Sequence, residues 1–383
     1  MKDDVYVLAD STFNGRRTGT EGERQAAEYI EKRFKEIGLE PKGYEDGYFQ
    51  QFTFRPSANP HQDAEFTGLK TDSTQTGRNV LGYIDNKAET TVVIGAHYDH
   101  LGMGGEGSLY REGAAIHNGA DDNASGVAMM LHLAEKLQKK NTNNNYLFIA
   151  FSGEEEGLLG SNYFVKNPTI DTKKVSYMIN MDMVGRLNEE NTLAVHGLGT
   201  SPVFKQVVLA HKDSLKISQH DSGIGPSDHT SFYLADIPVL HFFTGQHEDY
   251  HKPSDDSEKL NYKGMDEISD FIFNIITDLD DNSQLAFRKT KNESEEVPDF
   301  KVTLGVVPDY LFTGEGMRID GISEDRPAQH AGMQKGDIVK KMGDHNVNDM
   351  MSYMKSLSMF EKGQTTMVTI DRNGNVMEVE VTF

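Results

Sequence analysis

Short apolar runs that alternate with helical patterns constrain the fold of this chain of 383 residues more than any other feature. The apolar runs are Val80–Ile84, Thr91–Gly95, Tyr146–Phe151, Val175–Met181, Thr192–His196 and Pro238–Phe243. Amphipathic helical patterns lie between or after several of them, at Ala124–Lys139, Ser201–Lys212 and Gly264–Leu279. Strands that are apolar along their whole length are typical of sheets covered by helices on both faces. We therefore expect an α/β/α sandwich around a mostly parallel mixed sheet.

The segment before these runs predicts one further helix and a long irregular stretch. Thr20-Glu-Gly-Glu23 fits a capping box, in which each side chain binds a backbone amide at the helix start. Apolar residues then recur every three to four positions as far as Ile37, and Gly38 ends the helix. Residues 40–78 show no clear period, so we expect them to be irregular.

The composition changes after Leu279 and divides the chain. Residues 282–300 are polar and charged, which is typical of a linker. Residues 301–383 contain short strand patterns, two short helical patterns and frequent glycines. We therefore expect a first domain at 1–281, a linker at 282–300 and a small second domain at 301–383.

The overall composition excludes several kinds of function. A formal net charge of −22 argues against a nucleic-acid partner, because phosphate backbones are bound by basic surfaces. The sequence has no cysteine, which excludes disulfides, thiolate metal ligands and a cysteine nucleophile. No apolar stretch approaches the roughly 18–20 residues of a membrane span. The start Met1-Lys-Asp-Asp lacks the pattern of a signal peptide, so we expect either a cytosolic protein or an exported one whose signal was removed.

Five polar segments carry the residues that indicate a function. They are GAHYDH (95–100), GADDNASG (119–126), FSGEEEGLLGS (151–161), NMDMVGR (180–186) and DYHK (249–252). Each places His, Asp or Glu just after an apolar run, where ligand sites form in α/β sheets. Together they offer at least two histidines and at least three carboxylates, which suits a pair of divalent metal ions.

The first two segments offer His97 and three acids as candidates. His97 and Asp99 share a face of an extended backbone, so Asp99 can orient a metal-bound His97. A surface hydrogen-bond pair is the competing interpretation. Asp121 and Asp122 lie just before a helical pattern, where adjacent acids can cap the helix dipole. The functional interpretation is that Asp121 bridges two metals through both carboxylate oxygens.

The third segment places Glu154, Glu155 and Glu156 directly after an apolar run. Metal-assisted hydrolysis needs one carboxylate on the metal and another that is free to take a proton. Adjacent positions can supply both if the loop turns between them.

The last two segments add one acid and one histidine. Asp182 lies in an apolar run, where an unpaired carboxylate is costly, so we expect either a metal or Arg186 beside it. His251 is a loop histidine that only the other four segments make a candidate ligand. Three carboxylates against two divalent cations leave a charge of +1, which a bridging hydroxide neutralises, and this balance favours two ions.

These segments resemble the co-catalytic zinc aminopeptidase family, which also contains glutamate carboxypeptidase and glutaminyl cyclase. The likeness runs from about Gly15 to Leu279 and includes GRRTGTEGERQAAEYI, NVLGYI and, at 227–232, SDHTSF. The resemblance implies two Zn²⁺ ions per chain, held by His97, Asp121 as the bridge, Glu155, Asp182 and His251. Alignment on Gly157-Leu-Leu-Gly160 favours Glu154 as the general base and Glu155 as the ligand. The resemblance further implies that Tyr250 stabilises the oxyanion and that a cis peptide joins Asp121 to Asp122.

The tail resembles a bacterial PDZ domain of the protease-associated type. The strongest segment is Arg326–Val339, followed by a helical pattern at Asn348–Ser358. Gly314 and Gly316 precede the strand pattern Met317–Ile322 and suit a loop whose amides receive a peptide carboxylate. The competing interpretation is a PDZ fold that serves as a structural cap without a ligand.

The sequence therefore predicts a metal-dependent exopeptidase that hydrolyses the N-terminal residue of peptides, with a PDZ domain that can bind a peptide or protein C-terminus. Carboxypeptidase or glutaminyl cyclase chemistry on the same fold is one alternative, and His97 disfavours the cyclase because it completes a second metal site. A receptor-like binding protein without catalysis is the other. The resemblance favours export to the periplasm or out of the cell.

Overall fold

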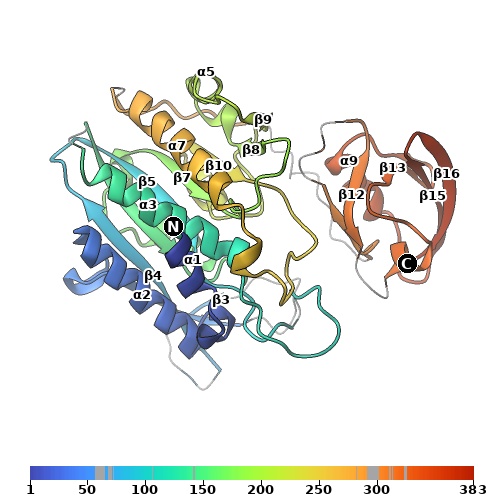
Figure 1. The fold of residues 1–383 in the computed structure, drawn as a ribbon, viewed down its shortest axis with the longest axis horizontal. Helices are drawn as coiled ribbons and strands as arrows, with labels where there is room; N and C mark the ends of the chain where they lie inside the picture. Colours follow the sequence, from blue (N-terminus) through green and yellow to red (C-terminus); the bar gives the residue numbers. More distant parts are fainter. Residues whose placement is uncertain are drawn as a thin grey trace. The chain divides into compact units, whose positions relative to one another are not determined.

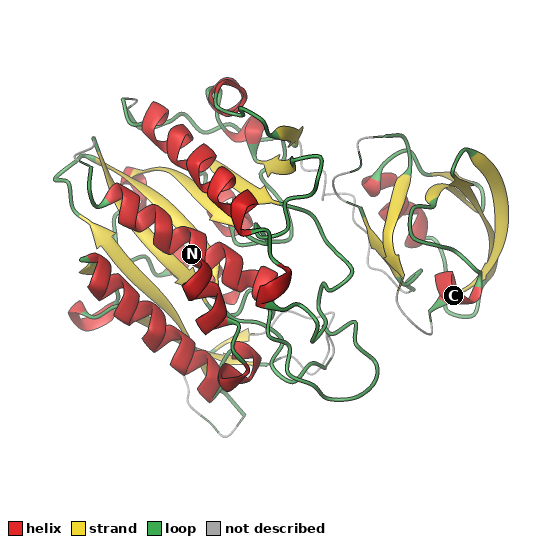
Figure 2. Ribbon diagram, in the orientation of Figure 1, coloured by secondary structure: helices red, strands yellow, loops and turns green. Residues whose placement is uncertain are grey.

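The computed structural model describes most of the chain as two compact units (Figures 1 and 2). The described residues are 1–56, 65–67, 71, 73–105, 107–140, 143–281, 283–290, 302–309, 312, 314–322 and 326–383. Residues 1–244 and 251–290 form the first unit, and residues 245–250 and 291–383 form the second.

The first unit extends to Thr290, past the expected boundary at residue 281. The amide of Leu285 donates to Ser176 Oγ at 3.1 Å, and the amide of Arg288 donates to the carbonyl of Thr200 at 2.8 Å. The amide of Thr290 donates to the Tyr233 hydroxyl at 2.9 Å. The sequence analysis assigned these residues to a linker because their side chains are mostly polar. Backbone amides make the bonds that attach them to the first unit, and such bonds do not depend on the type of side chain. The remaining part of the expected linker, 291–300, lies outside the described residues.

A mixed sheet forms the centre of the first unit, and each of the six expected runs contributes a strand to it. Its strands are β1 (Glu40–Pro41), β2 (Phe49–Arg55), β3 (Glu65–Phe66), β4 (Gln75–Ile84), β5 (Thr90–His97), β6 (Asn144–Phe151), β7 (Val175–Met181), β8 (Thr192–His196), β9 (Lys216–Gln219) and β10 (Val239–Phe243). They are arranged in the order β3-β2-β4-β6-β5-β7-β10-β8-β9, with β1 beside β4. The neighbours β6, β5, β7 and β10 are parallel, whereas β4 and β8 flank them in antiparallel pairing. The parallel part is therefore the middle of the sheet.

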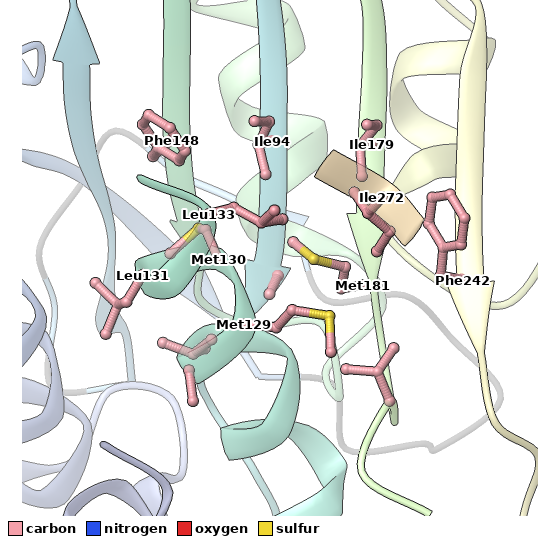
Figure 3. Packing of buried hydrophobic residues seen from close by; sticks show 14 of the residues in the cluster. Ile94, Met129, Met130, Leu131, Leu133, Phe148, Ile179, Met181, Phe242 and Ile272 are labelled. Atoms are coloured by element: carbon pink, nitrogen blue, oxygen red, sulfur yellow. The ribbon is translucent and has the colours of Figure 1, made fainter. Parts of the chain in front are cut away.

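Helices cover both faces of this sheet, as the apolar strands predicted. One face packs against residues from α1 (Lys2–Leu8), α2 (Glu21–Ile37), α3 (Gly126–Leu137), α5 (Phe204–Ala210) and α7 (Tyr262–Leu279). The other face packs against α4 (Leu159–Lys166) and α6 (His229–Tyr233). Figure 3 shows Met129, Met130 and Leu133 of α3 beside Ile94 and Met181 of the central strands. Among the described residues, none of the helices combines the length and apolar character that a membrane crossing requires.

The stretch expected to be irregular contains β2, which pairs with β4. Its inward positions are Gln50, Phe52 and Phe54, all buried. Gln50 occupies a core position because its amide group donates to the carbonyl of Asn167 at 2.7 Å and accepts from Asn79 at 3.0 Å. A polar residue at an inward position hid the alternation that otherwise marks a strand.

The second unit contains an antiparallel sheet and two short helices, as expected. Its strands are β11 (Val306–Pro308), β12 (Met317–Ile322), β13 (Ile338–Met342), β14 (His345–Asn346), β15 (Thr365–Arg372) and β16 (Asn375–Thr382). They follow the order β11-β12-β13-β15-β16, with β14 beside β13. Helices α8 (Pro327–His330) and α9 (Met350–Leu357) complete a core that is separate from that of the first unit.

Candidate metal centre

The candidate site lies at the carboxyl ends of three parallel strands. Strand β5 ends at His97, which pairs with Phe151 at the end of β6, and β7 ends at Met181. The residues that follow these ends include Glu154, Glu155 and Asp182. Parallel pairing brings these side chains to one edge of the sheet, where the sequence placed them.

The first group of candidate ligands surrounds the ring of His97. His97 Nε2 lies 3.3 Å from Asp122 Oδ1 and 3.3 Å from Asp182 Oδ1. Zinc bonds of about 2.0–2.1 Å in tetrahedral geometry hold two ligand atoms about 3.3 Å apart. The three side chains therefore fit a single divalent ion. The competing partner of Asp182, Arg186, instead lies 3.9 Å from Asp255.

The second group uses the other oxygen of Asp122. Asp122 Oδ2 lies 3.2 Å from His251 Nε2, and Glu155 Oε2 lies 3.4 Å from the same nitrogen. These spacings fit a second ion of the same kind. Burial alone would lower the pKa of His251, but Glu155 and Asp122 outweigh it and raise the pKa to about 9.

The acid whose two oxygens face both groups is Asp122, and not Asp121, to which the sequence analysis assigned the bridging role. Asp121 Oδ1 accepts from the amide of Gly185 at 2.6 Å. The amides of Asp121 and Asp122 both donate to Asp255 Oδ2, which fixes the turn so that Asp122 meets His97 and His251. The cis peptide is likewise shifted by one residue and joins Asp122 to Asn123. The side chains of adjacent acids in a turn point in different directions, and the spacing in the sequence does not show which of them faces the site.

Asp99 lies beside His97 and connects it to the glutamate loop. His97 Nδ1 is 3.2 Å from the carbonyl of Asp99 and 3.7 Å from its Oδ1. The carboxylate of Asp99 also accepts from Thr18 Oγ1 at 3.0 Å and from the amide of Glu154 at 3.2 Å. Asp99 thus occupies the place of a residue that orients His97.

The three adjacent glutamates have different surroundings. Glu155 belongs to the second group, whereas Glu156 pairs with Arg17 at 3.0 Å. Burial raises the pKa of the Glu154 carboxyl well above its usual range; His97 opposes this shift, while Asp182 raises the pKa further. A carboxyl group of raised pKa beside the ligands is suited to take up a proton.

Tyr250 lies in the segment 245–250, which the structure groups with the second unit. Its expected role as an oxyanion stabiliser stays a prediction.

Sequence reasoning assigned no role to Arg16, although it lies in the quoted GRRTGTEG motif. Arg16 is 1% exposed, and its guanidinium donates to four carbonyls. These are the carbonyls of Leu8 (2.5 Å), Tyr98 (2.7 Å), Asn118 (2.6 Å) and Gly119 (2.9 Å). Burial lowers its pKa to about 10, so it remains a cation at neutral pH. Arg16 therefore connects the backbone just after His97 with the backbone just before Asp122.

Replacing Arg16 with Met should destabilise the first unit by at least about 3 kcal/mol, because buried carbonyls lose charged donors. Arg17→Met is the matched control. Arg17 is about half exposed at its side chain (47%) and pairs with Glu156, so its loss should cost at most about 1 kcal/mol. Urea unfolding of both variants measures the difference, and equal midpoints would contradict the role assigned to Arg16.

A row of four histidines lies outside the metal groups. The rings of His196 and His220 stack at 4.2 Å, those of His229 and His241 stack at 4.4 Å, and His196 lies 5.4 Å from His241. Burial lowers the pKa of all four, and the pKa of His229 falls to about 3. Asp221 partly offsets the lowering at His220, and Asn180 does so at His241.

This row should make the protein sensitive to acid. His229 is neutral in the folded chain, but it binds a proton in the unfolded chain below about pH 6.5, so stability falls as the pH falls from there towards 3. Removing it in His229→Leu should reduce the slope of unfolding free energy against pH by up to about 1.4 kcal/mol per pH unit. Urea unfolding of both proteins between pH 7.5 and 5 tests this, and parallel slopes would refute it.

Comparison with known proteins shows which families the chain is similar to. Residues 79–276 match the model of peptidase family M28, and residues 285–383 match that of the PDZ domain. The aminopeptidase YwaD of Bacillus subtilis is 30% identical over 221 residues, which cover 53% of this chain and 45% of that protein. The chain spans about half the length of the curated relatives it matches.

Two solved structures show the same fold as the first unit. A zinc aminopeptidase from Bacillus subtilis has a TM-score of 0.56 at 18% identity and covers 74% of this chain and 98% of its own. The glutaminyl cyclase of Porphyromonas gingivalis also has a TM-score of 0.56 at 18% identity, covering 73% of this chain and 98% of its own.

Proposed function

The chain belongs to peptidase family M28, and on this premise we propose that it is a zinc-dependent aminopeptidase that removes the N-terminal residue of peptides. The observation that carries the proposal is the position of Asp122. Its two oxygens face separate ligand groups, one completed by His97 and Asp182 and the other by Glu155 and His251. This arrangement supports two zinc ions per chain. Bound in this way, the ions would activate a water molecule and polarise the scissile carbonyl.

The residues around the groups supply positioning and proton transfer. Glu154 would take a proton from the attacking water and pass it to the leaving amine, because it lies next to Glu155 without belonging to either ligand group. Asp99 holds His97 and the Glu154 amide in one network. Tyr250 would stabilise the oxyanion. The net charge of −22 favours approach of a positively charged peptide amino terminus.

The PDZ domain would bind a peptide carboxylate. The support is the match of residues 285–383 to the PDZ domain, a fold that binds peptides as an added strand. In the loop before β12, Gly316 adopts a φ of 104°, and its amide donates to the carbonyl of Asn348 at 2.7 Å, so this amide does not face a ligand.

Hydrolysis of aminoacyl amides, together with metal analysis, tests the proposal. We expect two zinc ions per chain, cleavage that a chelator abolishes and zinc restores, and no cleavage when the substrate's amino group is acetylated. Cleavage of acetylated peptides from the carboxyl end would identify a carboxypeptidase instead. Cyclisation of N-terminal glutamine without hydrolysis, with one zinc per chain, would identify a glutaminyl cyclase.

A further inference from the structure

His100 is a buried histidine that lies beside the second ligand group and has no assigned role. It follows Asp99 and is 1% exposed. Its Nδ1 lies 2.7 Å from Glu155 Oε1 and 3.8 Å from Asp122 Oδ2. Its ring meets the ring of His251 edge-on at 5.8 Å.

The distances distinguish a hydrogen-bond donor from a further ligand. Two ligands of one tetrahedral zinc ion lie about 3.3 Å apart, whereas about 2.7–2.9 Å is typical of a charge-assisted N–H···O bond. The two carboxylate oxygens of Glu155 differ in this respect. Oε2 lies 3.4 Å from His251 Nε2, a ligand spacing, while Oε1 lies 2.7 Å from His100 Nδ1, a hydrogen-bond length.

The surroundings of His100 fix its ring in this position. A Cβ on Gly119, whose φ is +59°, would lie 2.5 Å from His100 Cδ2, so the glycine leaves just enough room for the ring. The amide of His100 donates to the carbonyl of Arg16 at 3.4 Å. Because a carboxylate only accepts, Nδ1 must carry the proton. In the described part of the chain Nε2 is buried without a hydrogen bond.

We propose that His100 is a positioning residue of the second metal group. By donating Nδ1–H to Glu155 Oε1, it leaves Oε2 to face the ion shared with Asp122 and His251. His100 thereby sets the affinity of this group independently of the group around His97. The inference rests on the proposed two-ion site. Loss of such a supporting hydrogen bond typically weakens metal binding about 10–100-fold.

Paired amide substitutions in the full chain test the role of Nδ1. His100→Asn places its amide nitrogen near the position of Nδ1, whereas His100→Gln places it near Nε2. Zinc binding to the metal-free proteins is measured by competition with a chromophoric chelator, and Co²⁺ absorption reports each step separately. We expect H100Q to weaken one of the two binding steps about 10–100-fold and to leave the other unchanged, because only the group that contains Glu155 loses a supporting hydrogen bond. H100N should bind both ions like the original protein. Glu156→Gln, beside Glu155 but paired with Arg17, is the control and should change neither step.

The outcomes separate this inference from the proposed function. Unchanged binding by H100Q, or equal weakening of both steps, would overturn the role of His100. Equal loss in H100N and H100Q would mean that the imidazole is required for another reason, which also contradicts the proposal. A single binding step in the unsubstituted chain would instead overturn the two-ion site itself.

Discussion

Asp122→Asn should lose both metal ions, because one amide oxygen and no charge replace the two carboxylate oxygens that face His97 and His251. We expect the metal content after dialysis to fall from two ions to less than one per chain. Asp121→Asn is the matched control. Its amide oxygen can still accept from the Gly185 amide, so both ions should remain. Metal analysis by mass spectrometry measures both variants. Loss of the ions from D121N with retention in D122N would restore the original sequence-based assignment of Asp121.

The second large effect is expected for Glu154→Gln, which should keep both ions and lose about two to four orders of magnitude in kcat. Glutamine has nearly the same shape but cannot accept a proton from water. Glu156→Gln serves as the control, because that carboxylate pairs with Arg17 and should leave kcat within about threefold of the original. Steady-state hydrolysis of an aminoacyl amide, combined with metal analysis, separates the two effects. If E154Q lost a metal ion, Glu154 would be a ligand and the general base would have to be another residue.

The sequence predicted six strands of the central sheet, β4 to β8 and β10, because their runs are largely apolar. Strands that are buried along their whole length, such as β6 and β7, can be recognised from their own sequence without knowledge of the strands beside them. Strand β2 was missed because Gln50 occupies an inward position that only its bonds to Asn79 and Asn167 make tolerable. The short helix α6 was missed as well, since five residues give too little periodicity.

At the site, the sequence predicted which types of residue could bind a metal. It did not predict the directions in which adjacent side chains point. The position of His97 at a strand end was expected, whereas Asp182, which was expected inside an apolar run, directly follows the end of β7. The choice between Asp121 and Asp122 depended on Asp255, a partner more than a hundred residues away. His100 lies in the GAHYDH segment, but the sequence analysis assigned a role there only to His97 and Asp99. The role of Tyr250 and export from the cell stay predictions.

The hydrogen bonds that Arg16, Thr18 and Glu23 make have a consequence for exchanging parts between relatives. The family signature occupies residues 79–276, yet Thr18 binds Asp99 and Glu23 accepts from the hydroxyl of Tyr98 at 2.6 Å. A chimera that transplanted only the signature region would cut these bonds and leave α2 to a foreign sequence. The segment that a transplant must carry is therefore longer than the family signature, because it must also include Arg16, Thr18 and helix α2.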